Sequence, residues 1–181
     1  MSEDAKAYRE ADPDYFRAYG LRIKWDVVAE AGNIMSLEGF HYTFTGGAHG
    51  NYFTAGRLYD ATTGEPMRLS RFFQKPQAAI EAHMPVVWQE IAKQKAAKSG
   101  SVSQLERFEA EARELVSADM VLAGETSFVP SDKPGKFGGY AVHFAPYDIG
   151  SYAEGAYHIT IPQNLFRDTL KQQYMALFDG E

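Results

Sequence analysis

Apolar and polar residues alternate along the first third of the chain with the two-residue period of half-buried β-strands. The segment Leu21–Val27 has leucine, isoleucine, tryptophan and valine at every second position, with charged residues between them. Similar alternation predicts a second strand over 34–45 and a third over 51–60. The phase of the large side chains changes near Gly39 in the second segment, which indicates a β-bulge there.

Helical spacing replaces this alternation in the middle of the chain. Apolar residues recur every three or four positions from Pro76 to Gly100, and Pro85 inside the segment predicts a kink or a split. A second amphipathic stripe predicts a helix over 105–115. For the remainder we expect strands over 120–129, 140–144 and 157–161, and a final helix over 162–178.

The order of these segments predicts an α+β fold in which antiparallel β-sheets pack against several α-helices. The helical middle separates an N-terminal lobe, residues 1–75, from a helical and β lobe, residues 76–181. We expect the two lobes to form one compact unit. The polar and aromatic segment 2–19 resembles the end of a helix, so we expect the N-terminal lobe to be truncated at its start.

Composition excludes several classes of protein. The chain has 181 residues, of which 45% are hydrophobic and 23% charged, as in ordinary globular proteins. Its formal net charge of −6 argues against nucleic-acid binding and favours a cationic partner. The absence of cysteine excludes disulfides and thiolate chemistry, and no apolar run is long enough to span a membrane.

The sequence has no motif typical of a catalytic or metal site. It contains no Gly-x-Ser-x-Gly, His-x-His or His-Glu-x-x-His pattern, so we expect no catalytic residues, no metal and no cofactor. His41, His143 and His158 fall on predicted strands, where two of them could meet across neighbouring strands. Solvent-facing or helix-covered histidines are the simpler interpretation.

The first candidate site is the glycine-rich connection between the second and third strands. It reads Gly46-Gly47-Ala48-His49-Gly50, and three glycines in five residues indicate positive φ angles or a close approach of the backbone. A strand follows where a phosphate-binding loop requires a helix, so phosphate binding is excluded. The connection is either a binding loop with His49 facing a ligand or a tight turn that His49 caps.

The second candidate site is the long connection between the last two strands. It contains Pro146, Tyr147, Asp148, Tyr152 and Glu154. Tyrosines beside carboxylates suit the recognition of a sugar or of a basic protein surface. Alternatively, both rings fold under the loop and fix its conformation.

Two stretches together resemble a known family. They are Tyr42-Thr-Phe-Thr-Gly-Gly-Ala-His-Gly50 and Phe144-Ala-Pro-Tyr-Asp-Ile-Gly-Ser-Tyr-Ala-Glu-Gly155, the latter leading into Ile159-Thr-Ile-Pro162. The pair resembles DUF3298, an extracytoplasmic domain of RsiV-type anti-sigma factors that also occurs beside peptidoglycan deacetylase domains. The resemblance covers roughly 20–175 and implies an α+β fold, with residues 1–75 similar to the DUF4163 partner.

The resemblance implies a non-enzymatic binding module of the bacterial periplasm or cell surface. One anti-sigma member of the family binds lysozyme, so the expected ligand is lysozyme, another cationic protein, or peptidoglycan. The chain has no sigma-binding segment and no deacetylase domain, so the anti-sigma role is not carried over. The alternatives are a cell-wall hydrolase that uses His49 with a carboxylate, and a structural accessory domain. If Met1 is the true start, the protein is cytoplasmic.

Overall fold

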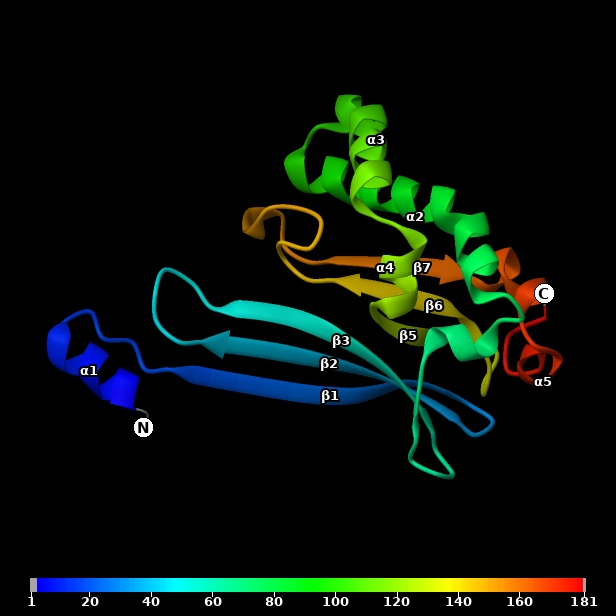
Figure 1. Cartoon of the computed structure of the whole chain (residues 1–181), viewed down its shortest axis with the longest axis horizontal. Helices are drawn as coiled ribbons and strands as arrows, with labels where there is room; N and C mark the ends of the chain where they lie inside the picture. The colour runs from blue at the N-terminus through cyan, green and yellow to red at the C-terminus, as the bar shows by residue number, and fades with distance from the viewer. Residues whose placement is uncertain (1–2, 181) are drawn as a thin grey trace.

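The computed structural model describes residues 3–180, and its first half is dominated by a long antiparallel sheet (Figure 1). A short helix, α1 (Glu3–Ala11), precedes it. The sheet contains β1 (Gly20–Ala31), β2 (Ile34–Phe44), β3 (Asn51–Asp60) and β4 (Pro66–Met67), in the order β1-β2-β3-β4. β1 therefore forms one edge of this sheet.

A smaller antiparallel sheet and most of the helices make up the second half. The sheet contains β5 (Glu125–Pro130), β6 (Phe137–Phe144) and β7 (Tyr157–Pro162), in that order. The helices are α2 (Pro76–Ser99), α3 (Leu105–Leu115), α4 (Ala118–Ala123) and α5 (Gln172–Met175). The predicted α+β class with antiparallel sheets is confirmed.

Two predicted elements are wrong in part. The start of the strand expected over 120–129 is helix α4, because the Ser117 side chain accepts a hydrogen bond from the Met120 amide and caps a helical turn. The helix expected over 162–178 is a series of short turns ending in α5. Leu170 is extended there and forms a β-bridge with Phe73, which interrupts any continuous helix.

Gly39 also differs from expectation, and Pro85 does not split its helix. β2 pairs with β1 through Gly39 without a shift, and the register shift lies in β1 between Val27 and Ala29. The Trp25 ring covers Gly39 so closely that an added Cβ would lie 2.7 Å from ring atoms. Helix α2 is one unbroken element from residue 76 to 99, with Pro85 exposed inside it.

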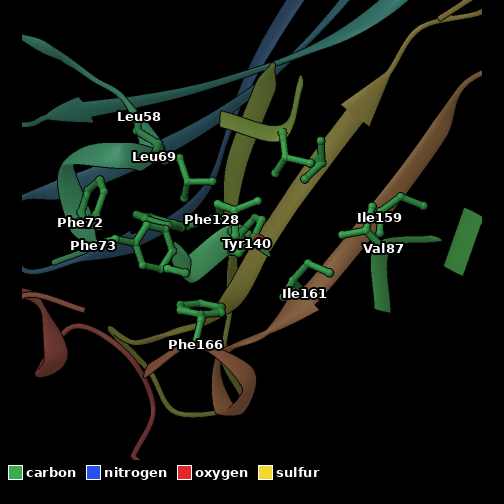
Figure 2. Packing of buried hydrophobic residues seen from close by; sticks show 14 of the residues in the cluster. Leu58, Leu69, Phe72, Phe73, Val87, Phe128, Tyr140, Ile159, Ile161 and Phe166 are labelled. Atoms are coloured by element: carbon green, nitrogen blue, oxygen red, sulfur yellow. The ribbon is translucent and has the colours of Figure 1, made fainter. Parts of the chain in front are cut away.

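Aromatic rings fill the core between the second sheet, α2 and the C-terminal turns (Figure 2). Phe128 lies at its centre, with ring centroids 4.7 Å from both Phe72 and Phe137. Tyr140 is fully buried, and its hydroxyl lies 2.7 Å from Nε2 of His83. Edge-to-face and tilted ring pairs of this kind add to the hydrophobic effect of burial, so they stabilise the second sheet from which the β6–β7 connection extends.

The two sheets cross at very short range where β3 passes β5. A Cβ added to Gly56 would lie 2.3 Å from the carbonyl carbon of Thr126, so only glycine fits there. Beside the crossing, the buried Ser36 hydroxyl accepts from the Phe128 amide at 2.8 Å and lies 3.0 Å from its carbonyl oxygen. The Gly56 amide donates to the Glu125 carboxylate, which also pairs with Arg57. The crossing therefore fixes the first sheet against the second.

We expect Gly56→Ala to destabilise the fold by about 1–3 kcal/mol or more, because the new methyl group overlaps the β5 backbone and the sheets have to separate. Gly20→Ala is the matched control, since nothing lies within 4 Å of a Cβ added at that strand position. Urea unfolding of both variants measures the effect. Equal stabilities would show that the crossing is not tightly packed.

Candidate functional site

The two loops singled out from the sequence meet in space at the end of the first sheet. The Tyr152 ring stacks on His49, with centroids 3.8 Å apart and planes 18° from parallel. Its hydroxyl also donates a hydrogen bond to the Gly50 carbonyl oxygen. Tyr147 and Tyr52 flank Tyr152, with ring centroids at 5.5 Å and 6.1 Å. We call His49, Tyr52, Tyr147 and Tyr152 the aromatic loop cluster.

Positive φ angles shape the β2–β3 connection. Gly46 has φ of 99° and Gly47 has φ of 89°, as three glycines in five residues predicted. Arg17 donates to the Gly47 carbonyl oxygen at 2.8 Å, which ties the segment before β1 to this loop. His49 Nδ1 lies 3.1 Å from the Gly50 carbonyl oxygen. His49 therefore has both a backbone contact and a ring contact.

The β6–β7 connection begins with a tight turn that holds Tyr147 in an unusual conformation. The Asp148 amide donates to the Ala145 carbonyl at 3.1 Å, so Pro146 and Tyr147 occupy the two central positions of the turn. Tyr147 has φ of 79°, a value that turns of this kind normally assign to glycine. Pro146 is buried, whereas 63% of Tyr147 is exposed. Strain at an exposed aromatic residue is typical of functional sites.

Asp148 and Glu154 bond to their own loop. The Asp148 carboxylate accepts from the Ala145 amide at 2.7 Å. The Glu154 carboxylate accepts from the Ser151 amide at 2.8 Å and from the Tyr157 hydroxyl at 2.6 Å, and it lies 3.6 Å from Lys95 Nζ. Partial burial opposes ionisation of Glu154, but these hydrogen bonds and the Lys95 charge outweigh it and lower its pKa to about 2. Both carboxylates therefore stabilise the loop's shape.

The structure thus divides the candidate residues into two groups. His49, Tyr147 and Tyr152 form the ring surface, while Gly46, Gly47, Pro146, Asp148 and Glu154 shape the backbone that presents it. Sequence reasoning missed Tyr52, which pairs with Tyr42 inside the sheet. Its position two residues after the last glycine of the loop was the available signal.

A partly buried polar chain lies near the crossing of the two sheets. The Ser127 hydroxyl donates to the Glu38 carboxylate at 2.8 Å and lies 2.9 Å from His143 Nε2. His143 Nδ1 lies 2.8 Å from His158 Nδ1, which confirms that two strand histidines meet across neighbouring strands. Burial lowers the pKa of His143 to about 4, although the Glu38 charge opposes this.

The direction of one hydrogen bond determines which atoms carry the protons in this series of polar groups. Because Ser127 donates to Glu38, His143 must donate through Nε2 to the Ser127 oxygen. His143 Nδ1 is then an acceptor, and His158 donates to it through its own Nδ1–H. Ser127 is fully buried, so its hydroxyl is not accessible to a substrate in this structure. The arrangement satisfies polar groups between the sheets.

The described residues 3–180 contain no group of three metal-ligating side chains and no helix long and apolar enough to cross a membrane. A separate pocket of about 340 Å³ lies beside the crossing, between β3, β4 and the start of β5. Arg57, Arg68 and Glu125 are among its lining residues, and Arg57 and Glu125 pair with each other. This pocket does not include either loop of the aromatic cluster.

Comparisons with known proteins identify the fold. A family model described as "Deacetylase PdaC" matches residues 1–52. The structure is similar to a DUF3298 family protein from Pseudomonas aeruginosa PAO1, at 19% identity and a TM-score of 0.57, over 97% of this chain and 72% of that one. It is also similar to a DUF3298 family member from Bacteroides fragilis NCTC 9343, at 18% identity and a TM-score of 0.63, over 98% and 67%.

These structural neighbours confirm the fold that the sequence resemblance implied: the chain has the fold of DUF3298 family proteins. Neither neighbour's description indicates a catalytic activity. The comparison with curated proteins finds no match.

Replacing Gly46 or Gly47 with valine should destabilise the protein by about 1–3 kcal/mol, since a β-branched residue resists a positive φ. A Cβ at Gly47 would meet nothing within 4 Å, so a loss of stability there indicates backbone strain rather than a clash of the new Cβ. Thermal unfolding followed by circular dichroism measures it. If both variants melt with the wild type, the loop does not require its glycines.

Stability should decrease as the pH falls from about 6.5 to about 4. Burial lowers the pKa values of both His83 and His143 to about 4, so in this window the unfolded chain binds more protons than the folded one. The decrease attributable to His83 is roughly 3 kcal/mol, at about 1.4 kcal/mol per pKa unit. Urea unfolding at pH 7 and pH 5 tests this, because the stability contributed by the lowered pKa of Glu154 is lost mainly below pH 4.5.

The matched variant is His143→Gln, which retains hydrogen-bonding groups but does not titrate. It should lose less stability than the wild type between the two pH values. A flat profile for the wild type would contradict neutral burial of these histidines.

Proposed function

We propose that this chain is a non-enzymatic, extracytoplasmic binding domain of the bacterial cell envelope whose aromatic loop cluster contacts the ligand. The observation that carries the proposal is the exposed Tyr147 ring, held at a φ of 79° beside the His49–Tyr152 stack. Strained backbone persists only where the surrounding structure enforces it. Hydrogen bonds between Ala145 and Asp148 hold the turn that contains Tyr147, and the His49–Tyr152 stack packs the second loop beside it.

The favoured ligand is peptidoglycan, contacted through its glycan strand. Tyrosine rings offer a flat apolar face that stacks on the carbon–hydrogen faces of sugars, and a hydroxyl that bonds to sugar oxygens. The Glu154 charge is offset by Lys95, and both carboxylates accept hydrogen bonds within their own loop, so they add little to ion pairing with a cationic ligand. The chemistry of the site therefore favours a neutral, hydroxyl-rich ligand.

A lysozyme-like or other cationic protein is the second candidate. The net charge of −6 supports it, because an acidic surface accelerates encounter with a basic partner. A hydrolase based on His49 has less support. Among the described contacts of His49 are the Tyr152 ring and the Gly50 carbonyl, and no hydrogen bond or ion pair joins it to a carboxylate.

The envelope assignment draws on the fold and on the family-model match. DUF3298 family proteins share the fold, and the matched model at residues 1–52 is described as a deacetylase. In this proposal the domain binds the cell wall and so holds an attached domain, or a neighbouring protein, close to its substrate there. Detection of the protein in periplasmic or surface fractions of its source cells supports this location, and confinement to the cytoplasm contradicts it.

Binding to soluble glycan fragments of peptidoglycan and to a basic lysozyme should be measured by titration calorimetry with the wild type and Tyr147→Asn. Asparagine tolerates positive φ, so the variant should keep the fold while losing the ring. We expect about tenfold weaker glycan binding, which corresponds to loss of about 1–2 kcal/mol. Tyr15→Asn is the matched control, because Tyr15 is 75% exposed and lies outside the cluster.

Glycan binding that Tyr147→Asn weakens and Tyr15→Asn preserves supports the proposal. Binding of lysozyme alone replaces the favoured ligand with the second candidate. Absence of binding to both, or equal binding by all three proteins, contradicts a binding role for the cluster.

A further inference from the structure

Strand β1 is a long edge strand whose outer side no described strand covers. It is the first strand of the β1-β2-β3-β4 sheet and runs for 12 residues (Figure 1). Its first eight residues, 20–27, are all exposed, whereas Ala29 and Ala31 are buried near the second sheet. Unpaired backbone groups along an edge of this length form a template for another strand.

One face of this edge is apolar. Leu21, Ile23, Trp25 and Val27 project to the same side and are 71%, 52%, 40% and 52% exposed. The apolar face continues across the sheet to Phe53, which stacks on His41 and is 41% exposed. Trp25 also lines a hollow of about 350 Å³ with Met35, Leu37 and Tyr59. Contiguous exposed apolar patches of this kind mark interaction sites.

We propose that two copies of this chain associate by antiparallel pairing of their β1 strands, with the two-fold axis at Trp25. In this register Lys24 lies opposite Asp26 of the second copy, and the symmetry generates the same pair again. On the other face Ile23 lies opposite Val27 of the second copy. Opposite charges and apolar side chains therefore match at every position of Ile23–Val27.

The neighbouring register lacks this match. An axis at Lys24 would place two lysines directly opposite each other, which is destabilising. Lys24 and Asp26 are 69% and 56% exposed and pair with each other at 2.7 Å within one strand. Association through β1 would therefore exchange this pair within one strand for two pairs between the copies. Edge pairing buries less surface than most permanent dimers, so the dimer should dissociate on dilution.

Charge exchange tests the register directly. Lys24→Asp places aspartate opposite aspartate, and Asp26→Lys places lysine opposite lysine, so each variant alone should weaken dimerisation by about tenfold or more. An equimolar mixture of the two variants has opposite charges across the edge and should dimerise as the wild type does. The double variant Lys24→Asp/Asp26→Lys should also dimerise. Sedimentation velocity over a range of concentrations measures each case.

Lys6→Asp and Asp14→Lys make the same charge changes on exposed residues outside β1 and serve as controls, with circular dichroism verifying the fold. Rescue in the mixture establishes the pairing, because only an interface between copies restores it. A wild type that is monomeric at all concentrations overturns the proposal. A dimer that neither single charge variant weakens also overturns the proposal. So does a dimer that Phe53→Asp abolishes while both charge variants retain it.

Discussion

The close crossing of β3 over β5 at Gly56 is the constraint on which the rest of the structure depends. With no side chain at Gly56, the two backbones approach so nearly that an added Cβ would overlap Thr126. This contact sets where the first sheet extends from the second. It brings the β2–β3 loop beside the β6–β7 loop, and His49 then stacks on Tyr152 across 103 positions of sequence.

The same crossing determines which polar groups are hydrogen-bonded between the sheets and which face of the first sheet is exposed. Ser36, Glu38, Ser127 and His143 satisfy one another or the backbone where the sheets meet, so burial there leaves these groups bonded. The opposite face of the first sheet receives no cover from the second. It carries Trp25 and Phe53 at the surface, which is why one sheet both frames the loop cluster and offers a second interaction surface.

The pattern of apolar residues and glycines predicted the features that depend on neighbouring residues in the sequence. Alternation located β1, β2 and β3, and glycine content predicted positive φ at Gly46 and Gly47. Tertiary packing decided the rest. The apolar spacing of the C-terminal segment looks helical, but Leu170 pairs with Phe73 instead. No sequence signal places Ser127 beside His143 and Glu38, because their contact follows from how two sheets cross.

Hydrogen exchange followed by mass spectrometry, with and without soluble glycan fragments of peptidoglycan, tests whether the aromatic loop cluster is the binding surface. We expect the ligand to slow amide exchange in residues 46–50 and 145–155, and to leave exchange in β1 and α3 unchanged. Because His49 of one loop stacks on Tyr152 of the other, protection should occur in both loops together. Protection elsewhere with none in these loops, or no protection at saturating ligand, would contradict the claim that the aromatic loop cluster is the binding surface.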